Sequence, residues 1–253
     1  MPSSIAVETT NPTLPIKRRP VPLFSGDGMT DVGQVREINE DSYAVCANLG
    51  LAVVADGVGG GHRGDVASRT VVDTLAAHFE RRGRFVFSPG ENAPRWLIEA
   101  IEEANSAIHH RFGGETSATT VVAAAFIQGG VFVAHAGDSR CYRLRANHLE
   151  QLTHDHSLFN EYLKRGLLTE ADREAFPLNN VMTRGVGFHE NLEVDCAFHQ
   201  HADGDRYLLC SDGVTDLLSD IEITQTLVQY DDNALAVQAL CDQAWEAGGH
   251  DNI

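Results

Sequence analysis

The 253-residue chain is short of basic residues, because 19 Lys and Arg stand against 36 Asp and Glu and give a formal net charge of −17. A net negative surface disfavours non-specific binding to nucleic acid or to anionic membranes. The chain also lacks an apolar run of bilayer length, and residues 1–24 lack the apolar core of a signal peptide. We therefore expect a cytoplasmic protein that binds neither nucleic acid nor membrane.

The five cysteines form no C-x-x-C pair, which argues against a zinc framework or a disulfide framework. They are predicted to be small buried residues in a reducing compartment. The glycine run at Gly57–Gly61 is not followed by Gly-Lys-Ser/Thr, so it is not a P-loop. The pair His154 and His156 around Asp155 lacks third and fourth ligands at suitable spacing, so zinc is not expected there either.

One globular domain is expected at residues 25–253, after a Pro-rich flexible leader at residues 1–24. Apolar periodicity predicts helices at Asp65–Arg82 and Asn92–Phe112, and two more that begin near Ser219 and at Asn233. Hairpin links outnumber crossovers, so mainly antiparallel sheets with helices outside them are expected, an α+β fold. The predicted strands are Tyr43–Asn48, Leu51–Asp56, Thr119–Ile127, Val131–Ala136, Arg140–Arg145, Leu192–Phe198 and Tyr207–Ser211. The segment Thr153–Gly187 has few β-branched runs and is a candidate insert or flap.

What the chain does have is a set of short acidic segments, most of them beside apolar strand-like runs. Carboxylates at strand ends can be gathered by a folded sheet into one cleft, where they repel one another and are costly to bury unpaired. Hard divalent cations with oxygen ligands are the natural counterions. The segments are Arg36–Asp41, Asp56–Gly60, Gly137–Arg140, Ser211–Gly213 and Asp251–Ile253.

Two of these segments share one design, in which an aspartate ends an apolar strand and a glycine follows. Asp56 and Asp212 are the aspartates, and a glycine there lets the backbone turn sharply and offer its carbonyl as a further ligand. Asp251 precedes Asn252, whose amide could orient it. Arg36 could grip two oxygens of a phosphate, although a surface ion pair with Glu40, four residues further on, is the alternative.

Taken together, these motifs resemble the metal-dependent protein serine/threonine phosphatases, the protein phosphatase 2C-like family, in their bacterial form. The resemblance runs from about Met29 to Ile253. The motifs that carry it are Gly33-x-x-Arg36-x-x-Asn39-Glu40-Asp41, Asp56-Gly57-Val58-Gly59-Gly60, Ser117-x-Thr119-Thr120, Gly137-Asp138-Ser139-Arg140, Thr153-x-Asp155-His156-Ser157, Ser211-Asp212-Gly213 and Asp251-Asn252.

The resemblance implies a four-layer α-β-β-α sandwich of two mainly antiparallel sheets, with the flap at about 153–187 beside the cleft. It also implies that Asp56 bridges two Mg²⁺ or Mn²⁺ ions. Asp212 and Asp251 would complete one ion, and the carbonyl of Gly57 would serve the other. The implied reaction is hydrolysis of phosphoserine and phosphothreonine in proteins by a water that two metal ions activate.

Further roles follow from the same resemblance. Glu40 and Asp41 would hold metal-bound waters, Arg36 would grip the substrate phosphate, and Asp138 would help to bind a third, weaker ion. The implied partners are phosphorylated proteins, a serine/threonine kinase or its substrates among them. We expect a monomer.

The chain departs from the family pattern in two places. Val58 stands where some members carry a histidine proposed as general acid, so a metal-bound water is the expected proton donor. His62 is a further candidate acid or phosphate contact, unless it is a simple loop histidine. Relatives continue beyond the segment that here ends at Ile253 into a final apolar strand, so we expect a longer natural chain and a frayed Asp251.

Two other functions stay open at this point. The chain could be a catalytically impaired phosphatase-like module that only binds phosphoproteins, which the early end of the sequence favours. It could also be a metal-dependent hydrolase of small phosphate esters. The presence of every acidic position of the motifs favours an active enzyme.

Overall fold

A computed structural model describes residues 24–59, 63–82, 93–112, 117–173, 175–178 and 181–253. The expected leader, apart from Phe24, and the candidate residue His62 lie outside the described residues. Among the helices that are described, none combines the length and the apolar character needed to cross a bilayer.

A large antiparallel sheet forms the first half of the sandwich. Its strands follow the order β1-β2-β4-β5-β8, and β3 pairs with β2 beside this path. The strands are β1 (Asp41–Cys46), β2 (Leu51–Val58), β3 (Ala118–Thr119), β4 (Val121–Ile127), β5 (Gly130–Ala136) and β8 (Asp195–Gln200).

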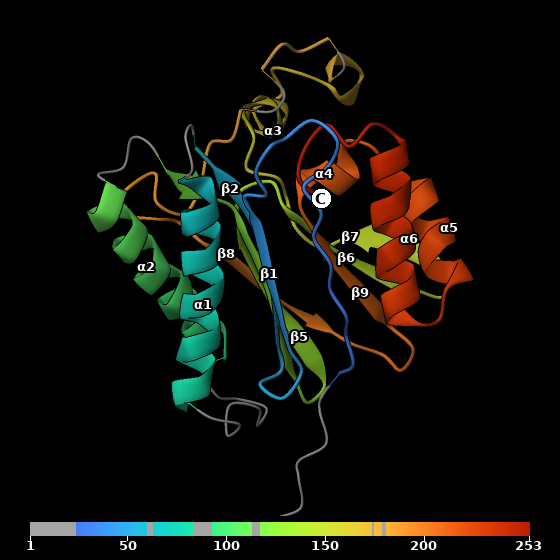
Figure 1. Ribbon diagram of the computed structural model, residues 1–253, viewed down its shortest axis with the longest axis horizontal. Coiled ribbons are helices and arrows are strands. Elements are labelled where there is room, and N and C mark those ends of the chain that lie inside the picture. Colours follow the sequence, from blue (N-terminus) through green and yellow to red (C-terminus); the bar gives the residue numbers. More distant parts are fainter. Residues whose placement is uncertain (1–23, 60–62, 83–92, 113–116, 174, 179–180) are drawn as a thin grey trace, which may run out of the picture.

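A smaller antiparallel sheet, in the order β7-β6-β9, faces the first. Helices α1 and α2 cover the outer face of the large sheet, and α5 and α6 cover the outer face of the small one (Figure 1). The predicted four-layer α-β-β-α sandwich is therefore confirmed. The remaining elements are α1 (Gly64–Arg82), α2 (Ala93–Phe112), β6 (Arg140–Arg145), β7 (His148–Gln151), α3 (Leu158–Lys164), the 3₁₀ turn η2 (Glu170–Asp172), β9 (Arg206–Cys210), α4 (Asp212–Thr215), α5 (Asp220–Gln229) and α6 (Asn233–Glu246).

Strand β2 shows how the sequence builds this layering. Leu51, Val53 and Ala55 alternate with less buried neighbours and pack against α1 and α2. Ala52 and Val54 point the other way and pack in the core between the two sheets. A strand with apolar residues on both faces must lie between two layers, because successive side chains point to opposite sides of a sheet.

Side chains cap the starts of several of these helices. Ser219 and Glu222 form a capping box at the start of α5, and Thr169 and Asp172 form one at η2. Ser157 accepts a hydrogen bond from the backbone of Asn160 and caps α3. These side chains satisfy backbone N–H groups that have no partner within the helix.

Several elements differ from the sequence-based expectation. The predicted strand Thr119–Ile127 is two strands, β3 and β4, and the first strand runs from Asp41 to Cys46 instead of Tyr43–Asn48. Strand β7 was not predicted, because His148–Gln151 has no apolar run, and the four-residue α4 is too short to show a periodic pattern. Strand β8 begins at Asp195 instead of Leu192. Its partner β5 sets this limit: the pairing stops at His135 with Asp195, after which the chain of β5 turns toward the other sheet.

The segment expected to form a flap carries α3 and η2 and projects from the end of the sandwich near α4 (Figure 1). Its base is tied to the body by backbone pairing between Thr119 and Val186. A second isolated bridge joins Ser157 to Met182 and closes the segment on itself.

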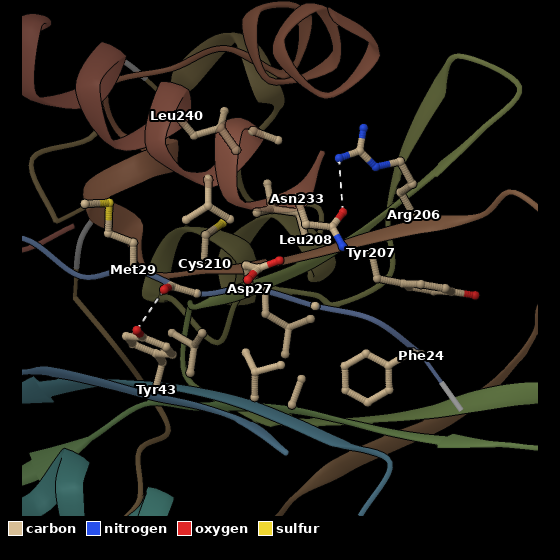
Figure 2. A pocket seen from close by; sticks show the side chains of 18 of the residues that line it. Phe24, Asp27, Met29, Tyr43, Arg206, Tyr207, Leu208, Cys210, Asn233 and Leu240 are labelled. Atoms are coloured by element: carbon tan, nitrogen blue, oxygen red, sulfur yellow. Dashed lines mark hydrogen bonds between the residues drawn. The ribbon is translucent and has the colours of Figure 1, made fainter. Parts of the chain in front are cut away.

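A cavity of about 570 Å³ lies between the extended segment at residues 24–30, β9 and α6. Figure 2 shows its wall, where the Tyr43 hydroxyl donates to the carbonyl of Gly28 at 2.7 Å. Asp41, Ser211 and Ile253 of the acidic segments line this cavity, together with Leu208, Leu240 and other apolar residues.

The core between the helices and the large sheet supplies a test of the packing. Phe79 on α1 is buried to 1% exposure, so Phe79→Ala should lower the free energy of unfolding by about 3–5 kcal/mol. Ile221→Ala, at a side chain that is 69% exposed, should change it by less than about 0.5 kcal/mol. Urea unfolding followed by circular dichroism measures both. Equal effects of the two substitutions would contradict the layer assignment.

Candidate metal centre

The β1–β2 hairpin brings the first two carboxylates together. Asp41 begins β1 and is the register partner of Asp56 near the end of β2. The backbone of Asp56 is held on both sides: its carbonyl accepts from the Thr120 N–H and the Thr119 hydroxyl, both at 2.8 Å, and its N–H donates to the Thr120 hydroxyl at 2.9 Å. The position of Asp56 is therefore fixed by the neighbouring strands β3 and β4.

Asp138 and Asp212 come from the points where the chain leaves the two sheets. Asp138 lies in the turn that carries the chain from β5 in the large sheet to β6 in the small one. Asp212 directly follows β9, whose last residue Cys210 pairs with Arg140 at the start of β6. This pairing brings the two aspartates to the same edge, and each raises the pKa of Asp56.

Asp251 is held firmly, which corrects the expectation of a frayed end. Ile253 is buried and exchanges two backbone hydrogen bonds with Asp31, at 2.8 and 2.9 Å. The Asn252 side chain donates to the carbonyls of Val32 and Ile38 and accepts from the N–H of Glu40.

The sequence suggested that the side-chain amide of Asn252 orients Asp251. In the structure the backbone N–H of Asn252 does so instead. The Asn252 N–H donates to Asp251 Oδ1 at 2.8 Å. The other oxygen, Oδ2, accepts from Arg36 Nη2 at 2.6 Å. Arg36 is half exposed, so its guanidinium lies beside the carboxylates and still reaches solvent.

Two glycines allow close backbone contacts at the centre. A Cβ at Gly57 would lie 2.2 Å from the carbonyl oxygen of Gly64, and one at Gly213 would lie 1.9 Å from the carbonyl oxygen of Asn252. Both distances are far below van der Waals contact, so no side chain fits at either position without moving the backbone. Glycine follows Asp56 and Asp212 because any larger residue would clash with these backbone atoms.

Glu40 lies in the same tightly packed region. Its Oε1 accepts from the N–H of Gly64 at 3.1 Å, and its backbone oxygen accepts from the N–H of Gly57 at 3.1 Å. Burial raises the pKa of Glu40, while the hydrogen bond from the N–H of Gly64 lowers it in part. The segment around Glu40 thus connects β2, α1 and, through Asn252, the C-terminal segment.

Burial among like charges dominates the electrostatics. Burial, followed by the charges of Asp41, Asp212 and Asp138, raises the pKa of Asp56 well above its usual range. Burial also raises the pKa of Asp41 and of Asp138 to about 6 and the pKa of Asp212 to about 7. Without cations, these groups hold protons near neutral pH because their ionised forms are poorly solvated and repel one another.

The unpartnered oxygens show that the residues fit divalent cations. Among the described residues, Oδ1 of Asp41 and Oδ1 of Asp212 are buried and find no hydrogen-bond partner. Buried polar atoms without partners are rare in folded proteins, and these two oxygens have lone pairs free to accept a cation or its bound water. The surrounding donors are carboxylate and carbonyl oxygens, which suit Mg²⁺ or Mn²⁺ better than soft metals.

Sequence reasoning gave no role to three residues of this region. Ser211 donates its hydroxyl to Asp41 Oδ2 at 2.7 Å. Asp65, in the first turn of α1, has a buried Oδ1 with no partner among the described residues. Asp216 raises the pKa of Asp212, and its spacing of four residues from Asp212 was the signal that could have placed both on one helical face.

Known proteins share both the sequence pattern and the fold of this chain. Residues 33–245, most of the chain, match the model described as Protein phosphatase 2C. The chain belongs to the protein phosphatase 2C family. Among curated members, it is 34% identical over 231 residues to the serine/threonine phosphatase stp of Listeria monocytogenes, covering 88% of this chain and 91% of that protein. It is also 34% identical over 231 residues to the protein phosphatase PhpP of Streptococcus pneumoniae, covering 89% and 93%.

Solved structures of protein phosphatase 2C relatives have the same fold. The Mycobacterium tuberculosis phosphatase PstP/Ppp superposes with a TM-score of 0.80 at 33% identity, covering 88% of this chain and 93% of that one. The catalytic domain of PstP in complex with two manganese ions gives a TM-score of 0.77 at 33% identity, with 88% and 92% covered. The predictions of the family, of its fold and of a metal-dependent protein serine/threonine phosphatase are confirmed.

The raised pKa values predict how the metal-free protein responds to pH. An aspartate in the unfolded chain has a pKa of about 3.9, whereas Asp212 in the folded protein has a pKa of about 7. Between these values the folded state binds more protons, so the free energy of unfolding contributed by Asp212 falls as pH rises. Asp212→Asn should therefore gain stability relative to the unsubstituted protein as the pH rises through this range.

The measurement is urea unfolding of both proteins in EDTA from pH 5 to pH 8. The difference between the two proteins is the observable, because burial lowers the pKa of His135 to about 4 and gives an opposite trend common to both. A difference that stays constant with pH would show that Asp212 ionises normally.

Proposed function

We propose that this chain hydrolyses phosphoserine and phosphothreonine in proteins with the carboxylate cluster as its metal centre. The observation that carries the proposal is the meeting of Asp56, Asp138, Asp212 and Asp251 at one edge of the sandwich, with Arg36 beside them. Asp56, Asp212, Asp251 and the Gly57 carbonyl are the residues to hold two Mg²⁺ or Mn²⁺ ions, and Asp138 helps with a third. Glu40 and Asp41 would hold waters bound to these ions.

The bound ions supply Lewis acidity, which lowers the pKa of water and neutralises charge on a phosphoryl group. The chain supplies the positioning. Arg36 has a half-exposed guanidinium whose orientation is set by its bond to Asp251, so its remaining N–H groups can donate to phosphate oxygens. Val58 beside the centre has no titratable group and cannot donate a proton to the leaving oxygen.

The substrate and the setting are proposed with the reaction. Substrates are phosphorylated proteins, a serine/threonine kinase or its substrates among them, because the relatives that the chain matches are named protein phosphatases. The five cysteines are free, and three of them are buried, which suits the reducing cytoplasm. We propose that the chain acts there as a monomer.

The central test is a manganese-dependent assay on a phosphothreonine peptide and on p-nitrophenyl phosphate. Asp56→Asn and Asp212→Asn should each lower kcat/KM on the peptide by about a thousandfold or more, because each removes a charge that holds the ions. Asp73→Asn is the matched control, since Asp73 is exposed on α1 away from the centre. Circular dichroism checks that each variant is folded.

The two substrates separate the alternatives. Hydrolysis of p-nitrophenyl phosphate without hydrolysis of any phosphopeptide would assign the chain to small phosphate esters. Binding of the phosphopeptide with no metal-dependent turnover of either substrate would assign it to phosphoprotein binding.

Arg36 provides a second and independent test. Arg36→Ala should lower kcat/KM on the phosphopeptide by about 10- to 100-fold, the value of a hydrogen bond to a charged group, mainly through KM. The kcat/KM of Arg36→Lys should lie between those of Arg36→Ala and the unsubstituted protein, because lysine keeps the charge and loses the bidentate geometry. Arg95→Ala on the outer helix α2 is the control, since Arg95 is 72% exposed and pairs with Glu99 on its own helix. An unchanged KM in Arg36→Ala would remove Arg36 from the phosphate site.

A further inference from the structure

The motif at Thr153–Ser157 contains two histidines, His154 and His156, and the acidic centre uses neither of them. We propose that His156 is a positioning residue, which fixes the Gly137–Asp138 turn and through it the Asp138 carboxylate. The inference rests on the proposed function in one respect, the role of Asp138 as a metal ligand. The hold of His156 on the turn is a property of the fold and can be tested without metal.

His156 binds both polar backbone groups of Gly137. The backbone N–H of Gly137 donates to the ring atom Nδ1 of His156 at 3.2 Å. The backbone N–H of His156 donates to the carbonyl of Gly137 at 2.9 Å. Gly137 has a φ of +115°, a region that favours glycine, and a Cβ there would lie 2.7 Å from Cβ of Thr120. The residue that precedes Asp138 is thus enclosed between Thr120 on one side and His156 on the other.

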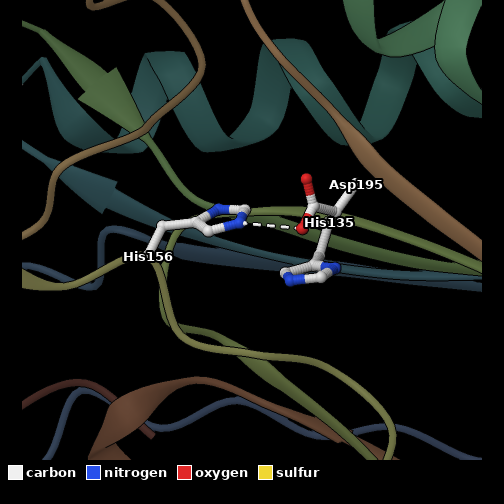
Figure 3. A group of neighbouring side chains, drawn as sticks. All are labelled: His135, His156 and Asp195. Carbon is white, nitrogen blue, oxygen red and sulfur yellow. Dashed lines mark ion pairs between the residues drawn. The ribbon is translucent and has the colours of Figure 1, made fainter. Parts of the chain in front are cut away.

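The His156 ring is itself held in place. Because Nδ1 accepts a hydrogen bond, the proton of the neutral ring is on Nε2, which faces Asp195 Oδ2 at 3.4 Å. The other oxygen of Asp195 accepts from Arg184 at 3.0 Å. Figure 3 shows Asp195 and His135 beside the ring, and the two imidazoles stack with centroids 4.8 Å apart.

The same three side chains could suggest a metal site, because each offers a ligand atom within 4.8 Å of the others. The ring geometry argues against it. The planes of His135 and His156 are only 9° from parallel and are stacked, so their in-plane lone pairs cannot meet at one ion. Nε2 of His156 also carries the proton, and Arg184 already supplies a cation to Asp195. The geometry therefore fits a chain of polar contacts, in which Arg184 bonds to Asp195, Asp195 faces Nε2 of His156, and Nδ1 of His156 accepts from Gly137.

The turn matters because it connects the two sheets at the acidic edge. On the inner side, the Thr120 hydroxyl bonds to the Ser139 hydroxyl at 2.7 Å and accepts from the N–H of Asp56. On the outer side, His156 supplies the side-chain acceptor for Gly137. Loss of this acceptor should loosen the turn and with it Asp138, whereas Asp56 keeps its bonds to Thr119 and Thr120.

Two substitutions distinguish the acceptor from the ring. His156→Phe keeps an aromatic ring over His135 and removes Nδ1. His156→Asn loses the stacking and keeps an acceptor, because Oδ1 of asparagine takes the place of Nδ1. In the metal-free protein, the amide of Gly137 should exchange with deuterium at least about tenfold faster in His156→Phe and within about threefold of the original rate in His156→Asn.

Manganese titration calorimetry provides the second readout. His156→Phe should lower the affinity of the weakest manganese-binding step about tenfold and leave the tighter steps unchanged. His156→Asn should keep the affinity of that weakest step near its original value. If His156→Phe does not yield folded protein, Asp195→Ala replaces it, since it removes the group that faces Nε2 and should also speed exchange at Gly137.

Unchanged exchange at Gly137 in His156→Phe and in Asp195→Ala would overturn the proposal. So would equal behaviour of His156→Phe and His156→Asn, because the ring and not the acceptor would then matter. A zinc titration that finds a tight site lost in His156→Phe would assign the cluster to a metal and overturn it as well. Absence of phosphatase activity in the unsubstituted protein would remove the proposed function, and the exchange result would still decide the role of His156.

Discussion

Repulsion among partly buried carboxylates is the constraint around which this sandwich is built. Burial raises the pKa values of Asp41, Asp56, Asp138 and Asp212 at one edge, and neighbouring carboxylates raise them further, most clearly at Asp56, where the charges of the other three act together. A flexible chain would relieve the repulsion by moving them apart. Here each sits in a backbone position that the strand ladders or the crossover turn determine, so the charge has to be met by protons or by metal ions. The large negative net charge of the chain adds to this demand.

The neutral residues between the carboxylates supply the rigidity. Asn252 satisfies four backbone groups or carboxylate atoms with its amide and its own N–H, and joins the last residues of the sequence to the segment that carries Arg36 and Glu40. Gly57 and Gly213 permit backbone approaches that any side chain would block. Threonine and serine hydroxyls tie Asp56 to its neighbours. Such a network preorganises ligands, so that ion binding need not reorder the chain.

Much of this could be predicted from the sequence, because strand–Asp–Gly corners and apolar runs report local structure. The helices and most strands were found within a few residues, as was the convergence of the acidic segments. Contacts that depend on tertiary structure could not be found. The link from Ser211 to Asp41 spans 170 positions, and the short polar strand β7 forms only because β6 offers it an edge. The true role of Asn252 was missed for the same reason, since its partners lie more than 200 residues away.

The crossover at Asp138 explains why one edge serves both sheets. A sandwich of separate hairpins would leave the two sheets joined by long loops, and side chains from each could then shift independently. Gly137, Asp138 and Ser139 make the passage in three residues, with β5 ending in one sheet and β6 starting in the other. Asp138 is thereby placed near Asp212, which begins α4 just after the small-sheet strand β9, while the neighbours of Asp138 bond to Thr120 and His156. The spacing of the charges is thus set by how the sheets are joined, and local sequence alone does not encode it.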